Sequence, residues 1–228
     1  MLPLPPAFVA TADPARLAQF REAWRAVGLP DCVREWRACV CPSAPSLGNA
    51  VAQYALARHA LASGLGSLLV FEDDAVPRED AAALLPGFLA DATARGVHAL
   101  RLGWIPLPSD DPPPDGRAVL GSHAYALLSR EAIEDYCEAW PDLAKADAVF
   151  VPMRGPVECA PQNLFAQFVP ATAASHGIHG ARGRFNADPR LNRIRSSYAA
   201  AFAAALRPNP ATVAGSTTPP REGGAPCP

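Results

Sequence analysis

The sequence predicts an α/β protein: a single domain in which helices flank a mainly parallel central sheet. Short apolar segments alternate with longer segments of helical character over the first two thirds of the chain, the order typical of parallel strands joined by crossover helices. The run Leu68–Phe71 is apolar throughout, as expected of a strand buried on both faces. A chain of 228 residues, half of them hydrophobic, can bury such a core.

Two strands and two helices are expected before Leu68. Residues 7–12 form a short apolar strand. Asp13 caps the helix that follows, and Pro14 suits its first turn. Glycine and proline residues separate the later segments. In order, the four elements comprise residues 7–12, 14–27, 33–41 and 47–63.

The alternation continues after the buried strand. Residues 78–95 are expected to form a helix and residues 98–103 a strand. Residues 122–128 form a further strand, after which Ser129 and the acids behind it favour the start of a helix. Residues 106–115 are rich in proline and aspartate, so we expect an exposed loop there.

The domain is expected to span residues 1–206, followed by a disordered C-terminal tail at residues 207–228. The tail is rich in Pro, Gly, Ser and Thr and has little to bury. Residues 194–206 form a candidate amphipathic helix, which we expect to dock on its own domain rather than on a membrane surface.

Composition and cysteine usage indicate a cytoplasmic protein. The N-terminus has no basic segment followed by an apolar one, and no apolar stretch is long enough to span a bilayer. The six cysteines match no zinc-site spacing and are expected to be free thiols. The formal net charge of −2 gives no general attraction to nucleic acid or anionic membranes.

Three carboxylates, Glu72, Asp73 and Asp74, follow directly on the buried strand. Their mutual repulsion costs free energy unless a cation or a phosphate-bearing ligand binds there, and ligands of open α/β sheets bind at the carboxyl ends of strands. In an extended backbone Glu72 and Asp74 share one face and can hold Mg²⁺ or Mn²⁺ with a diphosphate. An acidic turn before the next helix, with Pro77 in its first turn, is the alternative.

Three segments, in this order, resemble glycosyltransferase family 25. They are the helix containing Gly48 and Asn49, the run Val70–Pro77 (VFEDDAVP), and Gly121–Glu131, which is similar to the family's Gly-x-x-Ala-Tyr-x-x-Ser-Arg block. The family includes bacterial lipooligosaccharide and lipopolysaccharide galactosyltransferases and collagen galactosyltransferases. The resemblance covers roughly residues 7–180.

The resemblance implies a GT-A (Rossmann-like) fold and metal-dependent, inverting transfer of a sugar from a nucleotide-sugar, commonly UDP-galactose. Asp74 would bind Mn²⁺ or Mg²⁺ directly, and Glu72 would contact the metal's water shell or the donor ribose. Asp73 belongs to the same donor-binding block. Asp147 would be the base that takes the proton from the acceptor hydroxyl, although an N-cap role suits it equally.

Further candidates follow the first strand and lie in the third segment. Thr11, Asp13 and Arg16 would meet the nucleotide base and ribose, although Arg16 also suits an exposed helix position. His123 and Tyr125 alternate onto one face of a strand and can line the donor or acceptor pocket. A hydrogen-bonded structural role for His123 is the alternative.

The glycine-rich segment near residue 180 resembles the mobile C-terminal loop that often closes a GT-A donor site. His176 or His179 would complete the metal shell, and Arg182 or Arg184 would hold the diphosphate. An exposed linker is the alternative for this segment.

One departure from the family is Ala52-Gln53, where many members have Ser-His. If the family histidine contacts donor or acceptor, specificity differs in this chain. Gln53 is also simply a good helix former.

Other functions stay open at this point. The acids also suit a metal-dependent phosphoryl-transfer enzyme, and the fold suits a non-catalytic binding protein. The acceptor can be a glycan or lipooligosaccharide, a protein, a small molecule or a modified DNA base. The net charge disfavours DNA, whereas the arginines of residues 182–195 would supply a local basic surface.

Overall fold

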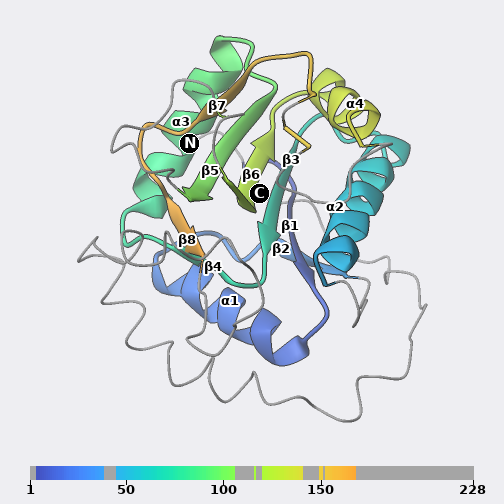
Figure 1. The fold of residues 1–228 in the computed structure, drawn as a ribbon. Helices are drawn as coiled ribbons and strands as arrows, with labels where there is room; N and C mark the ends of the chain where they lie inside the picture. The colour runs from blue at the N-terminus through green and yellow to red at the C-terminus, as the bar shows by residue number, and fades with distance from the viewer. Residues whose placement is uncertain are drawn as a thin grey trace.

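The computed structural model describes residues 4–38, 45–105, 116, 120–140, 149–150 and 152–167. The strands are β1 (Ala7–Thr11), β2 (Val33–Arg37), β3 (Leu68–Glu72), β4 (Ala75–Pro77), β5 (Ala99–Ile105), β6 (Leu120–Leu127), β7 (Val157–Cys159) and β8 (Phe165–Gln167). The helices are α1 (Pro14–Ala26), α2 (Pro45–Ala62), α3 (Ala81–Ala94) and α4 (Arg130–Glu138). Figure 1 shows their arrangement.

The central sheet has six strands in the order β2-β1-β3-β6-β5-β7. β1 pairs in parallel with β2 and β3, and β5 pairs in parallel with β7. β6 lies between β3 and β5 and is antiparallel to both. Because β6 is the strand of this sheet that runs against the others, the predicted α/β class with a mainly parallel sheet is confirmed.

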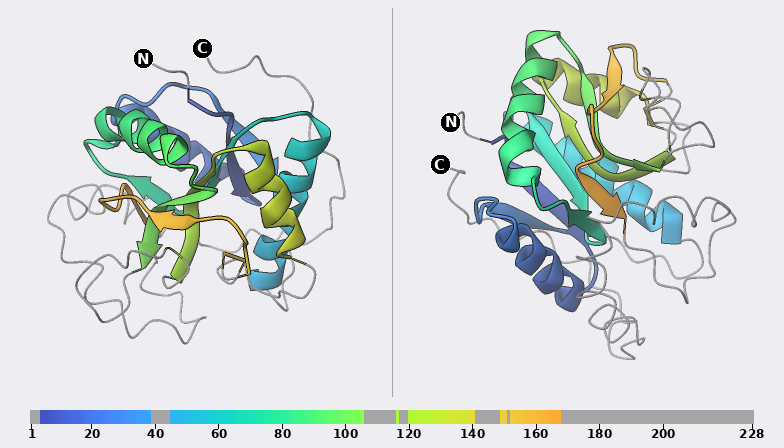
Figure 2. Two further views of the ribbon diagram at one scale, coloured as in Figure 1. Left: turned by 90° about the horizontal axis from the view of Figure 1, so that it is seen from above. Right: turned by 90° about the vertical axis from the view of Figure 1, so that its left-hand side faces the viewer.

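Helices cover both faces of the sheet (Figures 1 and 2). Side chains of α1 and α3 form one hydrophobic cluster with the sheet, and side chains of α2 and α4 form the other. Along β3, Leu69 and Phe71 belong to the first cluster, whereas Leu68 and Val70 belong to the second. The alternation of a strand buried on both faces therefore accounts for its unbroken apolar run.

Two helices begin where the sequence predicts. The Asp13 side chain accepts a hydrogen bond from the backbone amide of Ala15 at 2.8 Å and caps α1. Ser129 caps α4 in the same way, accepting from the amide of Ala132 at 3.0 Å.

The helix expected at residues 78–95 begins later than predicted, and the alternative that places Pro77 in its first turn is wrong. Residues 75–77 form β4, which pairs antiparallel with β8 outside the main sheet, and α3 begins at Ala81. This pairing joins segments about 90 residues apart, so the strand at residues 75–77 could not be predicted from local sequence propensity.

The expectation that all six cysteines are free thiols is wrong. Cys32 is disulfide-bonded, whereas Cys137 is a free thiol. Disulfides are rare in a reducing compartment, so the cytoplasmic location stays a prediction. In the part of the chain that the structure describes, no helix combines the length and apolarity needed to cross a bilayer. The predicted tail and the candidate helix at residues 194–206 lie outside the described residues.

Candidate active site

The acidic cluster, Glu72 with Asp73 and Asp74, lies at the carboxyl end of β3, beside the carboxyl end of β1. β3 ends at Glu72, and the two aspartates form a turn that leads into β4. The alternation expected of an extended backbone therefore does not hold. Asp73 and Asp74 are instead both within ion-pair distance of Arg16.

Asp73 is held by residues that follow β1. Thr11 Oγ1 donates to Asp73 Oδ2 at 2.7 Å, and Arg16 Nη2 lies 2.7 Å from Asp73 Oδ1. Asp13 starts the helix that carries Arg16. Burial raises the pKa of Asp73 to about 6, while Arg16 opposes the rise. The structure thus brings Thr11, Asp13 and Arg16 together with the acids, and their contact with a nucleotide stays a prediction.

Among the described residues, only one of the two carboxylate oxygens of Asp74 has hydrogen-bond or ion-pair partners. Gln167 Nε2, at the end of β8, donates to Asp74 Oδ2 at 3.2 Å, and Arg16 Nη2 lies 3.7 Å from the same oxygen. Asp74 Oδ1 is buried and has no hydrogen-bond partner among the described residues. Burial raises the pKa of Asp74 to about 7, and the neighbouring Glu72 adds to the rise. A buried, unpaired carboxylate oxygen is costly and marks a position for a ligand.

Glu72 is held by three donors that converge on its Oε1 atom. Asn49 Nδ2 and Ser122 Oγ each lie 2.8 Å from Oε1, and Gln53 Nε2 lies 3.0 Å from it. Asn49 and Gln53 are four residues apart on α2 and so share one face of the helix. Ser122 comes from the start of β6, which the antiparallel direction of that strand places at this edge of the sheet.

None of these three donors was predicted as a site residue. The spacing of Asn49 and Gln53 was visible in the sequence, but no local pattern shows which carboxylate they face. Gln167, which holds Asp74, lies 93 residues beyond its partner and likewise gave no local signal.

His123 and Tyr125 are both fully buried. The imidazole of His123 is hydrogen-bonded through Nε2 to the carbonyl oxygen of Phe165 at 2.9 Å, and the Tyr125 hydroxyl donates to Gln53 Oε1 at 3.1 Å. Tyr125 thus lies behind Gln53, which holds Glu72. Contact of either residue with a ligand stays a prediction.

The remaining predicted site residues, Asp147, His176, His179, Arg182 and Arg184, lie outside the described residues. Among the residues described, no three His, Cys, Asp or Glu side chains converge as a complete metal site. The unpaired Asp74 Oδ1 does fit Mg²⁺ or Mn²⁺, because such ions are commonly bound through one or two carboxylates, with phosphate and water oxygens as the other ligands. The described residues therefore fit a metal that binds together with a diphosphate.

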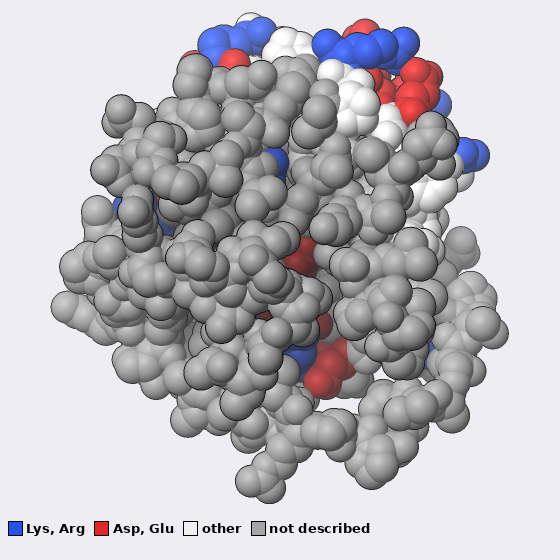
Figure 3. Space-filling model, in the orientation of Figure 1, with Lys and Arg blue, Asp and Glu red and all other residues white. Residues whose placement is uncertain are grey.

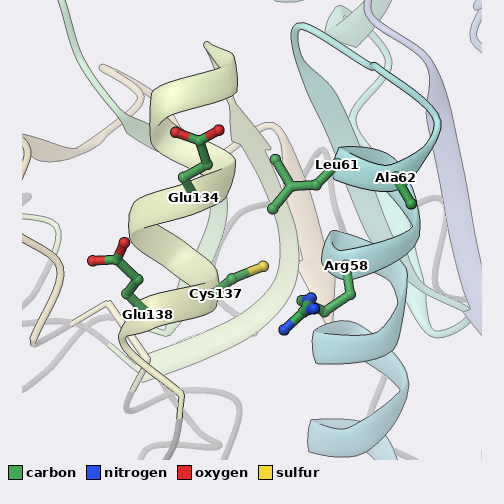
Figure 4. Close-up of a pocket in the computed structure, with 6 residues that line it drawn as sticks. All are labelled: Arg58, Leu61, Ala62, Glu134, Cys137 and Glu138. Carbon is green, nitrogen blue, oxygen red and sulfur yellow. The ribbon is translucent and has the colours of Figure 1, made fainter.

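A groove of about 410 Å³ lies between α2 and α4 and shares no lining residue with the acidic cluster (Figure 4). Its polar lining combines Arg58 with Glu134 and Glu138. Burial raises the pKa of the Cys137 thiol in this groove to about 11, so the thiol stays protonated and is a poor nucleophile. The acidic cluster is the better candidate for chemistry.

No known protein family matches the chain, and no curated protein matches it either. Among solved structures, the chain is similar to a glycosyltransferase involved in the glycosylation of the major capsid of PBCV-1. The TM-score is 0.47 and the sequence identity 9%, over 79% of this chain and 97% of that chain. A likeness at this level supports no inference about function, so the functional argument rests on the site itself.

Proposed function

We propose that the chain is a metal-dependent, inverting glycosyltransferase that transfers a sugar from a nucleotide-sugar, such as a UDP-hexose, to an acceptor hydroxyl. The observation that carries the proposal is the buried Asp74 Oδ1, which has no hydrogen-bond partner among the described residues, at the carboxyl ends of β1 and β3, where α/β sheets bind nucleotides. The raised pKa of Asp74 favours the same view, because a cation would relieve its crowding with Glu72. The sequence motifs that resemble family 25 suggested this reaction class, although no known family matches the chain.

In this proposal each described residue has one task. Asp74 holds Mn²⁺ or Mg²⁺, and Glu72 accepts hydrogen bonds from the donor ribose or from metal-bound water. Arg16 is 26% exposed in its side chain and can turn from Asp74 toward the diphosphate. When bound, the ion neutralises charge on the departing nucleoside diphosphate. Asp147 is proposed as the base toward the acceptor.

The acceptor proposed first is a glycan, with lipooligosaccharide as the class that the resemblance suggests. A modified DNA base is less favoured, because DNA binding requires a surface of one sign. In Figure 3 the visible described residues place arginines and acids side by side along the upper edge. Phosphoryl transfer and non-catalytic sugar-nucleotide binding are the competing functions, and no observation on the described residues favours either.

A binding screen tests the proposal. UDP-, GDP- and CMP-sugars are titrated calorimetrically with Mn²⁺, with Mg²⁺ and with EDTA, for the natural chain and for Asp74→Asn. We expect binding of a UDP-sugar only with metal, and loss of that binding in the variant. The matched control is Asp91→Asn, which removes an exposed acid on α3. Failure of every donor to bind with metal present would contradict the proposal, as would unchanged binding by Asp74→Asn.

A further inference from the structure

A buried chain of hydrogen bonds leads from Glu72 into the layer between α2 and α4. Gln53, at its centre, is fully buried. Its Nε2 atom donates to Glu72 Oε1 at 3.0 Å and to Asn49 Oδ1 at 3.2 Å. Its Oε1 atom accepts from the hydroxyls of Tyr125 at 3.1 Å and Tyr136 at 3.2 Å. Both ends of the amide are therefore engaged, and a 180° flip would set its NH₂ group against the hydroxyls and its oxygen against Glu72.

The Glu72 carboxylate only accepts hydrogen bonds and therefore requires the NH₂ end of the amide, while the two tyrosines occupy its oxygen end. Their hydroxyl oxygens lie 2.7 Å apart, and their rings are stacked with centroids 5.6 Å apart. Burial raises the pKa of both hydroxyls above the ordinary value, so both keep their protons. The contact between the two hydroxyls uses at most one of their two protons, so at least one hydroxyl is left to donate to Gln53 Oε1. The amide oxygen is thus held at the tyrosines and the NH₂ group at Glu72.

Packing alone does not explain a glutamine at this position. The surrounding side chains of α2 that face the sheet are apolar, among them Ala52, Leu56 and Ala57. Burying an amide among them costs desolvation free energy, which an apolar side chain would avoid. The cost is offset by the bonds to a carboxylate and two hydroxyls, and such a network is specific only when every member is satisfied.

We propose that Gln53 is a positioning residue of the acidic site: it fixes the Glu72 carboxylate for ligand contact, and Tyr125 and Tyr136 lock Gln53 in the donating orientation. The inference rests on the proposed function, since Glu72 must contact the donor or its metal for its orientation to matter. It implies that α4, which carries Tyr136 and no residue of the acidic cluster, influences donor affinity through two hydrogen bonds.

The test compares three variants by calorimetric titration with UDP-galactose and Mn²⁺, alongside thermal unfolding. Gln53→Met keeps the volume and removes the donor, and we expect it to weaken donor binding by roughly 10-fold to 100-fold, the usual effect of residues that orient a metal-site ligand. Tyr136→Phe should weaken it less, because Tyr125 still reaches Gln53. Tyr54→Phe, which removes an exposed hydroxyl bond to Arg58 on the same helix, should change nothing. If Gln53 had only a structural role, Gln53→Met would lower the melting temperature without changing the donor affinity of the folded protein.

A second readout separates this inference from the proposed function. The side-chain amide protons of Gln53, observed by NMR, should shift in Tyr136→Phe and not in Tyr54→Phe. If Gln53→Met binds the donor as tightly as the natural chain, the inference is overturned while the proposed function stands. If the natural chain binds no donor, the proposed function fails. Unchanged Gln53 amide signals in Tyr136→Phe would then overturn the locking of Gln53 as well.

Discussion

Replacing Asp74 with Asn should stabilise the fold at neutral and alkaline pH. Asn is nearly isosteric, and its carbonyl oxygen can still accept the bond from Gln167. The change removes a buried negative charge that is crowded by Glu72. Burial and repulsion from Glu72 destabilise ionised Asp74 in the folded protein. A neutral side chain at this position therefore stabilises the native state.

The raised pKa sets the size and the pH range of the effect. A rise in pKa from 3.8 to about 7 corresponds to a destabilisation of the ionised form by roughly 4 kcal/mol, at about 1.36 kcal/mol per pKa unit. This is an upper value, because part of the rise comes from repulsion that Asp74 shares with Glu72. The folded state of the natural chain binds this proton more tightly than the unfolded state does. The stability that the protonated Asp74 carboxyl contributes is therefore fully present below about pH 4 and is lost as the pH rises through about 7.

The assay is thermal unfolding of both proteins with EDTA at pH 5 and at pH 8. A gain of about 2–4 kcal/mol at pH 8 raises the melting temperature by roughly 5–10 °C in a chain of this length. At pH 5 the gain should shrink to less than half. The control Asp91→Asn, at an exposed acid, should show no such pH dependence. An Asp74→Asn protein as stable as the natural chain at pH 8, or less stable, would refute the reasoning.

Two further predictions concern the charged groups around the sheet. Arg16→Gln should cost about 1–3 kcal/mol at pH 8, because it leaves the buried Asp73 carboxylate without its 2.7 Å ion pair. Arg16→Lys should recover part of that loss in denaturant unfolding, and equal stability of the two variants would speak against the ion pair. Asp135→Asn should also destabilise the fold by about 1–3 kcal/mol at neutral pH. Burial opposes ionisation of Asp135, but the backbone amides of Arg154 and Gly155, both 2.9 Å from the carboxylate, outweigh it and lower its pKa. Its stabilisation is present above the unfolded pKa and is lost as the pH falls through the lowered value, so the two proteins should converge in acid melts.

The predictable part of this fold is local. The unbroken apolar run at Leu68 predicted a doubly buried strand, and Asp13 and Ser129 predicted two helix starts, because strand burial and helix capping are written within a few residues. Thr11, Asp13 and Arg16 were assigned to the donor site through the family resemblance, and they lie beside the acids because the parallel strands β1 and β3 end at the same edge.

The unpredictable part depends on contacts between distant segments. Gln167 reaches Asp74 only because β8 pairs with β4. The sequence leaves open whether Gln53 replaces a ligand-contacting histidine of the family or is only a helix former, because its bonds to Glu72 and Tyr125 join distant segments. The prediction that Glu72 and Asp74 share one face also failed, because side chains alternate only while the strand continues and the chain turns after Glu72.

The reversed direction of β6 has a consequence for engineering this scaffold. The acids lie at the carboxyl ends of β1 and β3, and the reversed direction of β6 places its first residues, among them Ser122, at the same edge of the sheet. The register of these strands is fixed by their ladder pairing and by the two buried clusters. A library that varies exposed side chains at this edge, and keeps the acids and Ser122, would keep a folded host while it samples new ligands.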